Sequence, residues 1–148
     1  MPAKSGDRLC QSGREVVDML RQEMLDEKVW AVIGVSDDRK KYGNKVYRRL
    51  KSLGYTVYAV NPGLNEVEGD PCYPDLRALP EKPAVINMVV SPRISLAILP
   101  EAAELGIRLV WFQPGSWDEA VGELCDRLNL TMLQDCVLMA TINRMSAG

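Results

Sequence analysis

Residues 29–61 carry the pattern that most limits what this chain can fold into. Two apolar runs, residues 29–35 and 56–60, predict buried parallel strands, and the segment between them has the spacing of an amphipathic helix ending at Gly54. In such a strand–helix–strand unit, the first turn presents backbone N–H groups and the positive end of the helix dipole. An anionic phosphate is therefore the expected ligand of that turn.

The rest of the chain continues the alternation of strands and helices. Further apolar runs predict strands at residues 84–90, 108–112 and 130–133. In the turn-rich stretch before them, Gly69 and Pro71 argue against regular structure. Because alternating strands and helices pair in parallel through right-handed crossovers, the predicted fold is of the α/β class: a doubly wound, five-stranded parallel sheet with helices on both faces.

Three helices are expected outside the first unit. Ser12 with Glu15 fits a capping box that opens a leading helix packed on the domain, and Ser116 with Glu119 fits a second one. Between them, the helix expected at residues 91–105 contains a proline, which predicts a kink or the start of a second helical piece.

The whole chain, residues 1–148, is expected to be one domain, since no linker or repeat interrupts it. Residues 1–28 form its leading helix, residues 29–139 its core and residues 140–148 a C-terminal tail.

Composition removes several classes of function. A net charge of −2 and the lack of a basic stripe argue against nucleic acid, and no apolar run is long enough to span a membrane. The chain has no histidine, so Ser–His and Cys–His nucleophiles are excluded. Cys10, Cys72, Cys125 and Cys136 lie at wide, irregular intervals, which disfavours a metal site. A cytoplasmic protein with reduced thiols is expected.

Candidate binding residues follow the predicted strands, because ligands of doubly wound sheets lie beyond the strands' carboxyl ends. Gly34, Ser36 and Gly43 suit the approach of a phosphate to backbone amides, or simply a tight turn. The basic run at residues 39–41 offers charge to phosphate oxygens, or is a solvated loop. We favour binding because the run lies inside the phosphate turn.

Later strand ends leave similar alternatives open. Asn61 and Pro62 either bound an adenosine or turn the chain, and they stand where a dehydrogenase usually has an acidic residue. Neither GxGxxG nor GxxxxGK[ST] is present. Gln113 and Gly115 serve either a ligand or a helix-entry loop. Cys136 is interpreted as a buried small hydrophobe in preference to a reactive thiol.

Five segments together carry a resemblance to a known family: VIGVSDD at 32–38, YG at 42–43, GYTVYAVNP at 54–62, EVEGDPCYPDL at 66–76 and VWFQPGSW at 110–117. The chain resembles the small stand-alone CoA-binding proteins. Their Rossmann-like domain also forms the N-terminal part of the succinyl-CoA synthetase alpha subunit. Departures from the family pattern are Gly63 for a frequent lysine, Asn87 for a frequent aspartate, and Cys136 one residue before the family cysteine.

This resemblance implies coenzyme A laid along the strand ends, with the diphosphate near the first turn and the adenosine near Asn61. Basic side chains would serve the diphosphate and the 3′-phosphate. The residues expected to bind CoA are Gly34, Val35, Ser36, Arg39, Lys40, Lys41, Tyr42, Gly43, Asn61, Pro62, Val90, Ser91, Arg93, Gln113 and Gly115.

The leading hypothesis is a CoA- or acyl-CoA-binding protein that acts as a non-catalytic carrier, sensor or regulatory module, with no catalytic residues and no metal. A nicotinamide-dependent or thiol-dependent enzyme is the first alternative. A protein-interaction module that has lost its ligand is the second. Assembly as a homo-oligomer or with a partner enzyme stays open.

Overall fold

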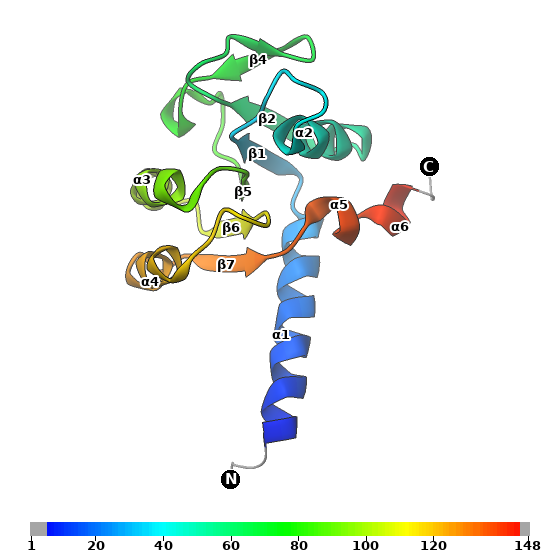
Figure 1. Cartoon of the computed structure of the whole chain (residues 1–148), viewed down its shortest axis with the longest axis vertical. Coiled ribbons are helices and arrows are strands. Elements are labelled where there is room, and N and C mark those ends of the chain that lie inside the picture. Colours follow the sequence, from blue (N-terminus) through cyan, green and yellow to red (C-terminus); the bar gives the residue numbers. More distant parts are fainter. Residues whose placement is uncertain (1–5, 146–148) are drawn as a thin grey trace.

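The computed structural model describes residues 6–145, with side chains from residue 13 onward. Its centre is a seven-stranded sheet in the order β3-β4-β2-β1-β5-β6-β7 (Figure 1). The strands are β1 Val29–Ile33, β2 Thr56–Val60, β3 Glu66–Val67, β4 Asp70–Tyr73, β5 Val85–Met88, β6 Leu109–Phe112 and β7 Thr131–Gln134. All pairs are parallel except β3 with β4. The five predicted strands are present, and the α/β fold with a Rossmann-like parallel core is confirmed.

The prediction of only five strands is wrong, because the turn-rich stretch forms the β3–β4 hairpin. Gly69 lies in the turn of this hairpin with φ +81°, beside Glu68 with φ +52°. Pro71 lies in β4 opposite Glu66, whereas β4 pairs with β2 only at Cys72 and beyond. Pro71 thus lies outside the part of β4 that pairs with β2, so its missing N–H does not interrupt that pairing.

Helices cover both faces of the sheet, as expected (Figure 1). They are α1 Gly6–Asp26, α2 Tyr42–Ser52, α3 Pro92–Glu104, α4 Glu119–Arg127, α5 Val137–Ala140 and α6 Ile142–Met145, with one 3₁₀ turn, η1 Leu76–Ala78. Alternate residues of β1 enter two cores. Trp30 packs in a core with Leu50 of α2, and Ile33 packs in a core with Leu99 of α3 and Val121 of α4.

The connections that follow β1 and β5, which are neighbours in the sheet, run in opposite directions. This reversal makes a topological switch point between the two strands. The chain goes from β1 through α2 to β2 on one side, and from β5 through α3 to β6 on the other. Ligands of doubly wound sheets bind outside the strand ends at such a point. Within the described residues, no helix is both long and apolar enough to cross a membrane.

Helix α1 differs from the expected leading helix. It begins at Gly6, so Ser12 lies inside it and the predicted capping box is wrong. The leading helix was expected to pack on the domain, but it extends away from the sheet (Figure 1), and its Val16 and Met19 are 54% and 69% exposed. From residue 13 onward, where its side chains are described, the buried ones are Met24 and Leu25 in the last turns. Its twenty-one residues make a helix about 30 Å long.

Two other expectations on helices need correction. Asp118, not Ser116, caps α4, since its carboxylate accepts from the Val121 N–H at 2.9 Å. The Ser116 hydroxyl instead donates to the Gln113 carbonyl at 2.6 Å. Helix α3 is a single helix that contains Pro100, so the proline does not begin a second piece.

Candidate ligand-binding site

The turn between β1 and α2 is held against its neighbours by two glycines. Gly34 has φ +92°, and a Cβ there would lie 2.4 Å from the Val89 carbonyl oxygen. A Cβ on Gly43 would lie 2.4 Å from the Gly34 carbonyl oxygen. Any side chain at these positions would push the turn away from β5 or from α2. Both glycines therefore set how closely three elements meet at the switch point.

The loop that follows is folded by its own polar groups. The Ser36 hydroxyl accepts from the Asp38 N–H, and the Asp38 carboxylate accepts from the Lys40 N–H, both at 3.0 Å. Lys41 is the N-cap residue of α2 and makes no side-chain capping bond there. The first turn of α2 has no acidic residue. The N–H groups and the dipole at the start of this helix thus remain available to an anion.

Asn61 ties the end of β2 to this turn. Its Nδ2 donates to the Val35 carbonyl at 2.7 Å, and its Oδ1 accepts from the Gly63 N–H at 2.8 Å. Both ends of the amide are thus engaged with backbone. These two bonds fix the turn after β2, and Asn61 thereby also helps to form the wall of the neighbouring cavity.

A cavity of about 370 Å³ opens at the switch point between the strand ends and α3. Four of the predicted residues line it: Gly34, Asn61, Pro62 and Val90. Sequence reasoning missed the rest of the lining, which is Ile33, Val60, Pro74, Asp75, Leu76, Ile94, Ile98 and Glu101. Ile94 and Ile98 lie one turn apart on the same side of α3, but their spacing alone does not show which side of the helix faces the strand ends.

The predicted cationic residues lie around this cavity and not in its lining. Arg39, Lys40 and Lys41 are exposed on the loop before α2, and Arg39 pairs with Glu68 at 3.2 Å. Arg93 is exposed in the first turn of α3, after the N-cap residue Ser91. Arg39 is thus held by an ion pair, whereas Lys40, Lys41 and Arg93 project from the surface near the start of α2 or of α3.

A larger hollow, about 760 Å³, lies between α2, the β3–β4 hairpin and the C-terminal helices. Three of its four basic residues, Arg48, Arg49 and Lys51, have structural partners. Arg49 donates to the Leu138 carbonyl at 2.6 Å, and Lys51 pairs with Asp70 at 3.1 Å. The smaller cavity is the better candidate for a ligand, because it is lined by the carboxyl ends of β1 and β2 and the larger hollow is not.

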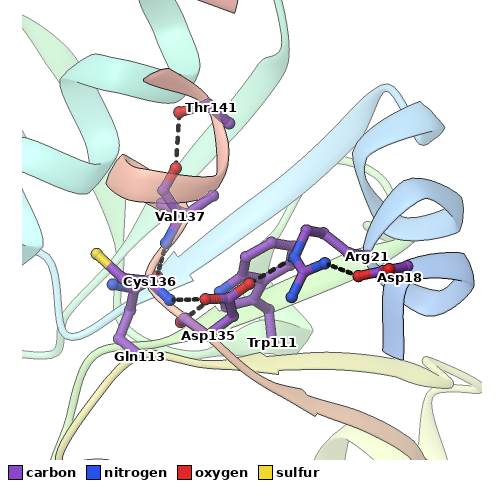
Figure 2. A network of polar contacts seen from close by, with 8 residues as sticks. All are labelled: Asp18, Arg21, Trp111, Gln113, Asp135, Cys136, Val137 and Thr141. Carbon is purple, nitrogen blue, oxygen red and sulfur yellow. Dashed lines mark hydrogen bonds and ion pairs between the residues drawn. The ribbon is translucent and has the colours of Figure 1, made fainter. Parts of the chain in front are cut away.

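At the ends of β6 and β7, the structure buries the amide of Gln113, which is 1% exposed. Its Oε1 accepts from the Val137 N–H at 2.9 Å. Its Nε2 has no hydrogen-bond partner among the described residues, and neither has the Oδ1 of the adjacent Asn87. Figure 2 shows the Gln113 nitrogen directed toward the sulfur of Cys136. Gly115 follows with φ +93°.

Cys136 is not the buried hydrophobe expected from the sequence. It is half-buried, and its Sγ lies 3.2 Å from the Tyr42 hydroxyl. Burial raises the pKa of its thiol, but the Tyr42 hydroxyl, the backbone N–H groups of Met139 and Leu138, and the Gln113 amide lower it. The net pKa lies below the usual value for cysteine. The sequence hid this environment because Tyr42 is 94 residues away.

A polar network fixes the backbone beside this thiol (Figure 2). The Asp135 carboxylate accepts from the Cys136 N–H at 2.8 Å and pairs with Arg21 of α1 at 2.5 Å. The indole N–H of Trp111 donates to the Asp135 carbonyl at 2.7 Å. Trp111 itself is fully buried.

The strand order and the two crossovers put the chain among the Rossmann-like α/β proteins, which bind their ligands beyond the strand ends. Comparison with known sequences narrows this class. Residues 28–141 match the CoA binding domain family, and the chain belongs to that family. The resemblance noted from the sequence is thereby confirmed.

Three relatives illustrate the range of the family. An ADP-forming acetate–CoA ligase from Archaeoglobus fulgidus is 40% identical over 56% of this chain, which spans only 12% of the ligase. A conserved hypothetical protein from Pyrococcus furiosus is 35% identical, with a TM-score of 0.74 over 77% of this chain and 99% of its own. A hypothetical protein from Pyrococcus horikoshii OT3 is 27% identical, with a TM-score of 0.80 over 87% of this chain and 92% of its own.

Proposed function

We propose that this protein binds CoA or acyl-CoA along the carboxyl edge of its sheet and acts as a non-catalytic carrier, sensor or regulatory module. The observation that carries the proposal is the cavity at the switch point, lined by Gly34, Asn61, Pro62 and Val90 in a chain of the CoA binding domain family. A site of this size and largely apolar lining suits one aromatic base. Two carboxylates of the lining also suit the exocyclic amine of adenine, which donates hydrogen bonds. Asp75 caps η1 and Glu101 pairs with Arg77 at 3.3 Å, but a carboxylate can accept several hydrogen bonds at once.

The phosphates have a separate place in this proposal. The uncapped start of α2 lies across Gly34 and Gly43 from the cavity, and the exposed side chains of Arg39, Lys40 and Lys41 precede it. A diphosphate leaving the cavity would meet backbone N–H groups, a helix dipole and these three cations. Arg93, with Ser91 at the start of α3, is the cation proposed for the 3′-phosphate.

A nicotinamide-dependent enzyme has less support. A dehydrogenase places a carboxylate at the end of the second strand to bind the ribose hydroxyls. Here the residue is Asn61, and both ends of its amide are occupied by backbone groups. The end of β2 therefore lacks the carboxylate with which a dehydrogenase binds the ribose of its nicotinamide cofactor.

Thermal unfolding in the presence of ligands tests the proposal. CoA at about 100 times its Kd should stabilise the protein by about 2.7 kcal/mol, and dephospho-CoA should stabilise it less at the same concentration. Ile94→Trp, which fills the cavity from α3, should reduce the shift with CoA. Ile142→Trp is the matched control, since Ile142 is 54% exposed on α6 and does not line the cavity. No shift of the native protein with CoA would refute the proposal.

A further inference from the structure

Three elements meet at the sulfur of Cys136, at the same edge of the sheet as the proposed site. Cys136 follows β7, Tyr42 begins α2, and Gln113 follows β6. The binding of adenosine and phosphates uses neither the sulfur nor the Gln113 amide. This group of side chains is therefore unexplained by the proposed function.

The orientation of the Gln113 amide is fixed by its oxygen. Because Oε1 accepts from the Val137 N–H at 2.9 Å, Nε2 must point the other way, toward Cys136 (Figure 2). Among the described residues, no oxygen or nitrogen accepts from this buried nitrogen, so the Cys136 sulfur is the acceptor that it faces. A neutral thiol is a weak acceptor, whereas a thiolate accepts strongly. The Gln113 N–H and the Tyr42 hydroxyl are both directed at the Cys136 sulfur, and two such donors stabilise its thiolate form.

The nearest carboxylate does not oppose a thiolate here. Asp135 is paired with Arg21, which also contacts Asp18 at 2.7 Å. Its Oδ1 accepts from the backbone N–H of Cys136. The negative charge next to the cysteine is thus balanced by a guanidinium and turned toward a donor.

The other cysteines with described side chains have the opposite character. Cys125 is fully buried, and burial raises its pKa to about 11. Cys72 is 9% exposed, and burial raises its pKa as well. Neither is set up to react at neutral pH, because the thiolate is the nucleophile.

We propose that Cys136 is a thiol–disulfide exchange site for the pantetheine end of CoA, with Tyr42 and Gln113 as the donors that hold its sulfur. This inference rests on the proposed function, because CoA anchored at the switch point would extend along the strand ends toward β6 and β7.

The reaction is an exchange without net oxidation. The Cys136 thiolate attacks one sulfur of CoA disulfide, and a bond forms between Sγ and that sulfur. The bond between the two pantetheine sulfurs breaks, and the second CoA leaves as a thiolate that takes a proton from water. One disulfide is consumed and one is formed. The product is a protein–CoA mixed disulfide that a free thiol reverses.

Intact mass measurement with peptide mapping tests the inference. The reduced protein is incubated with CoA disulfide or with glutathione disulfide at equal concentration. We expect one CoA adduct on Cys136, formed about tenfold or more faster than the glutathione adduct because binding places the disulfide at the sulfur. Tyr42→Phe should slow adduct formation. Tyr58→Phe is the matched control, since its hydroxyl bonds Glu81 on another face.

Cys136→Ser separates this inference from the proposed function. The variant should form no adduct at that position, yet reduced CoA should still raise its unfolding temperature. If CoA stabilises the native protein but CoA disulfide leaves Cys136 unmodified, the exchange site is refuted and CoA binding stands. Equal rates with the two disulfides would also refute it, since they would indicate a reactive thiol without recognition of CoA.

Discussion

At the level of single residues, the Cys136 sulfur depends on side chains that lie far from it in the sequence. The Tyr42 hydroxyl is 3.2 Å away, and the thiol raises the pKa of that hydroxyl while its own pKa is lowered. The thiol therefore loses its proton first, and the tyrosine stays protonated as the donor. Burial alone would have had the opposite effect on the cysteine.

Tyr42→Phe should consequently raise the pKa of Cys136. Removing the hydroxyl deletes the strongest of the interactions that lower this pKa and leaves the burial that raises it. The rate of iodoacetamide alkylation at Cys136, followed against pH, should show its inflection at higher pH than in the native protein. In Tyr58→Phe the inflection should stay in place. A profile of Tyr42→Phe that overlaps the native one would show that the tyrosine only packs there.

At the level of elements, the turn between β1 and α2 depends on backbone contacts that leave no room for a side chain. Gly43→Ala would place a Cβ 2.4 Å from the Gly34 carbonyl oxygen, which is backbone and cannot swing away. We expect a loss of about 1–3 kcal/mol in the free energy of unfolding, measured in urea. Gly13→Ala in α1 is the matched control, because nothing lies within 4 Å of the new Cβ.

That control should gain stability slightly, by up to about 1 kcal/mol, from its higher helix propensity. If Gly43→Ala were as stable as Gly13→Ala, the claim that α2 packs too closely against the turn to accept a side chain at position 43 would be refuted.

Elements with strong local patterns were predictable from the sequence. The strand at residues 56–60 and the stop of α2 at Gly54 are as expected, the latter with φ +94°. The hairpin β3–β4 was not predictable, because its two short strands are stabilised by pairing with each other and with β2. Likewise, Asp118 and Ser116 both precede α4, and only the path of the chain decides which of them caps it.

The candidate site also contains residues that the sequence could predict and residues that it could not. Residues at strand ends, such as Asn61 and Val90, were predictable because parallel strands align their carboxyl ends. Ile94, Ile98 and Glu101 were missed, since their role depends on how α3 is rotated over the sheet. The environment of Cys136 depends on three distant segments, so no local pattern could indicate it.

At the level of the whole molecule, one ion pair connects the first helix to the end of the last strand. Arg21 of α1 contacts Asp135 at 2.5 Å, and the two side chains are 29% and 26% exposed. Most of α1 lies beyond the sheet, so this pair, together with buried Met24 and Leu25, fixes where the helix meets the domain (Figure 1). Because Asp135 also accepts from the Cys136 N–H, the helix and the thiol share one carboxylate.

Arg21→Gln should therefore affect both stability and the thiol. Loss of the half-buried pair should lower the free energy of unfolding in urea by about 1 kcal/mol. The Asp135 carboxylate, no longer balanced, should disfavour the thiolate and slow alkylation of Cys136 at neutral pH. Asp18→Asn is the control: Asp18 is 73% exposed, so losing its contact with Arg21 should change neither quantity measurably. Alkylation of Arg21→Gln at the native rate would show that α1 does not influence the thiol, and the helix would then serve only to anchor the chain.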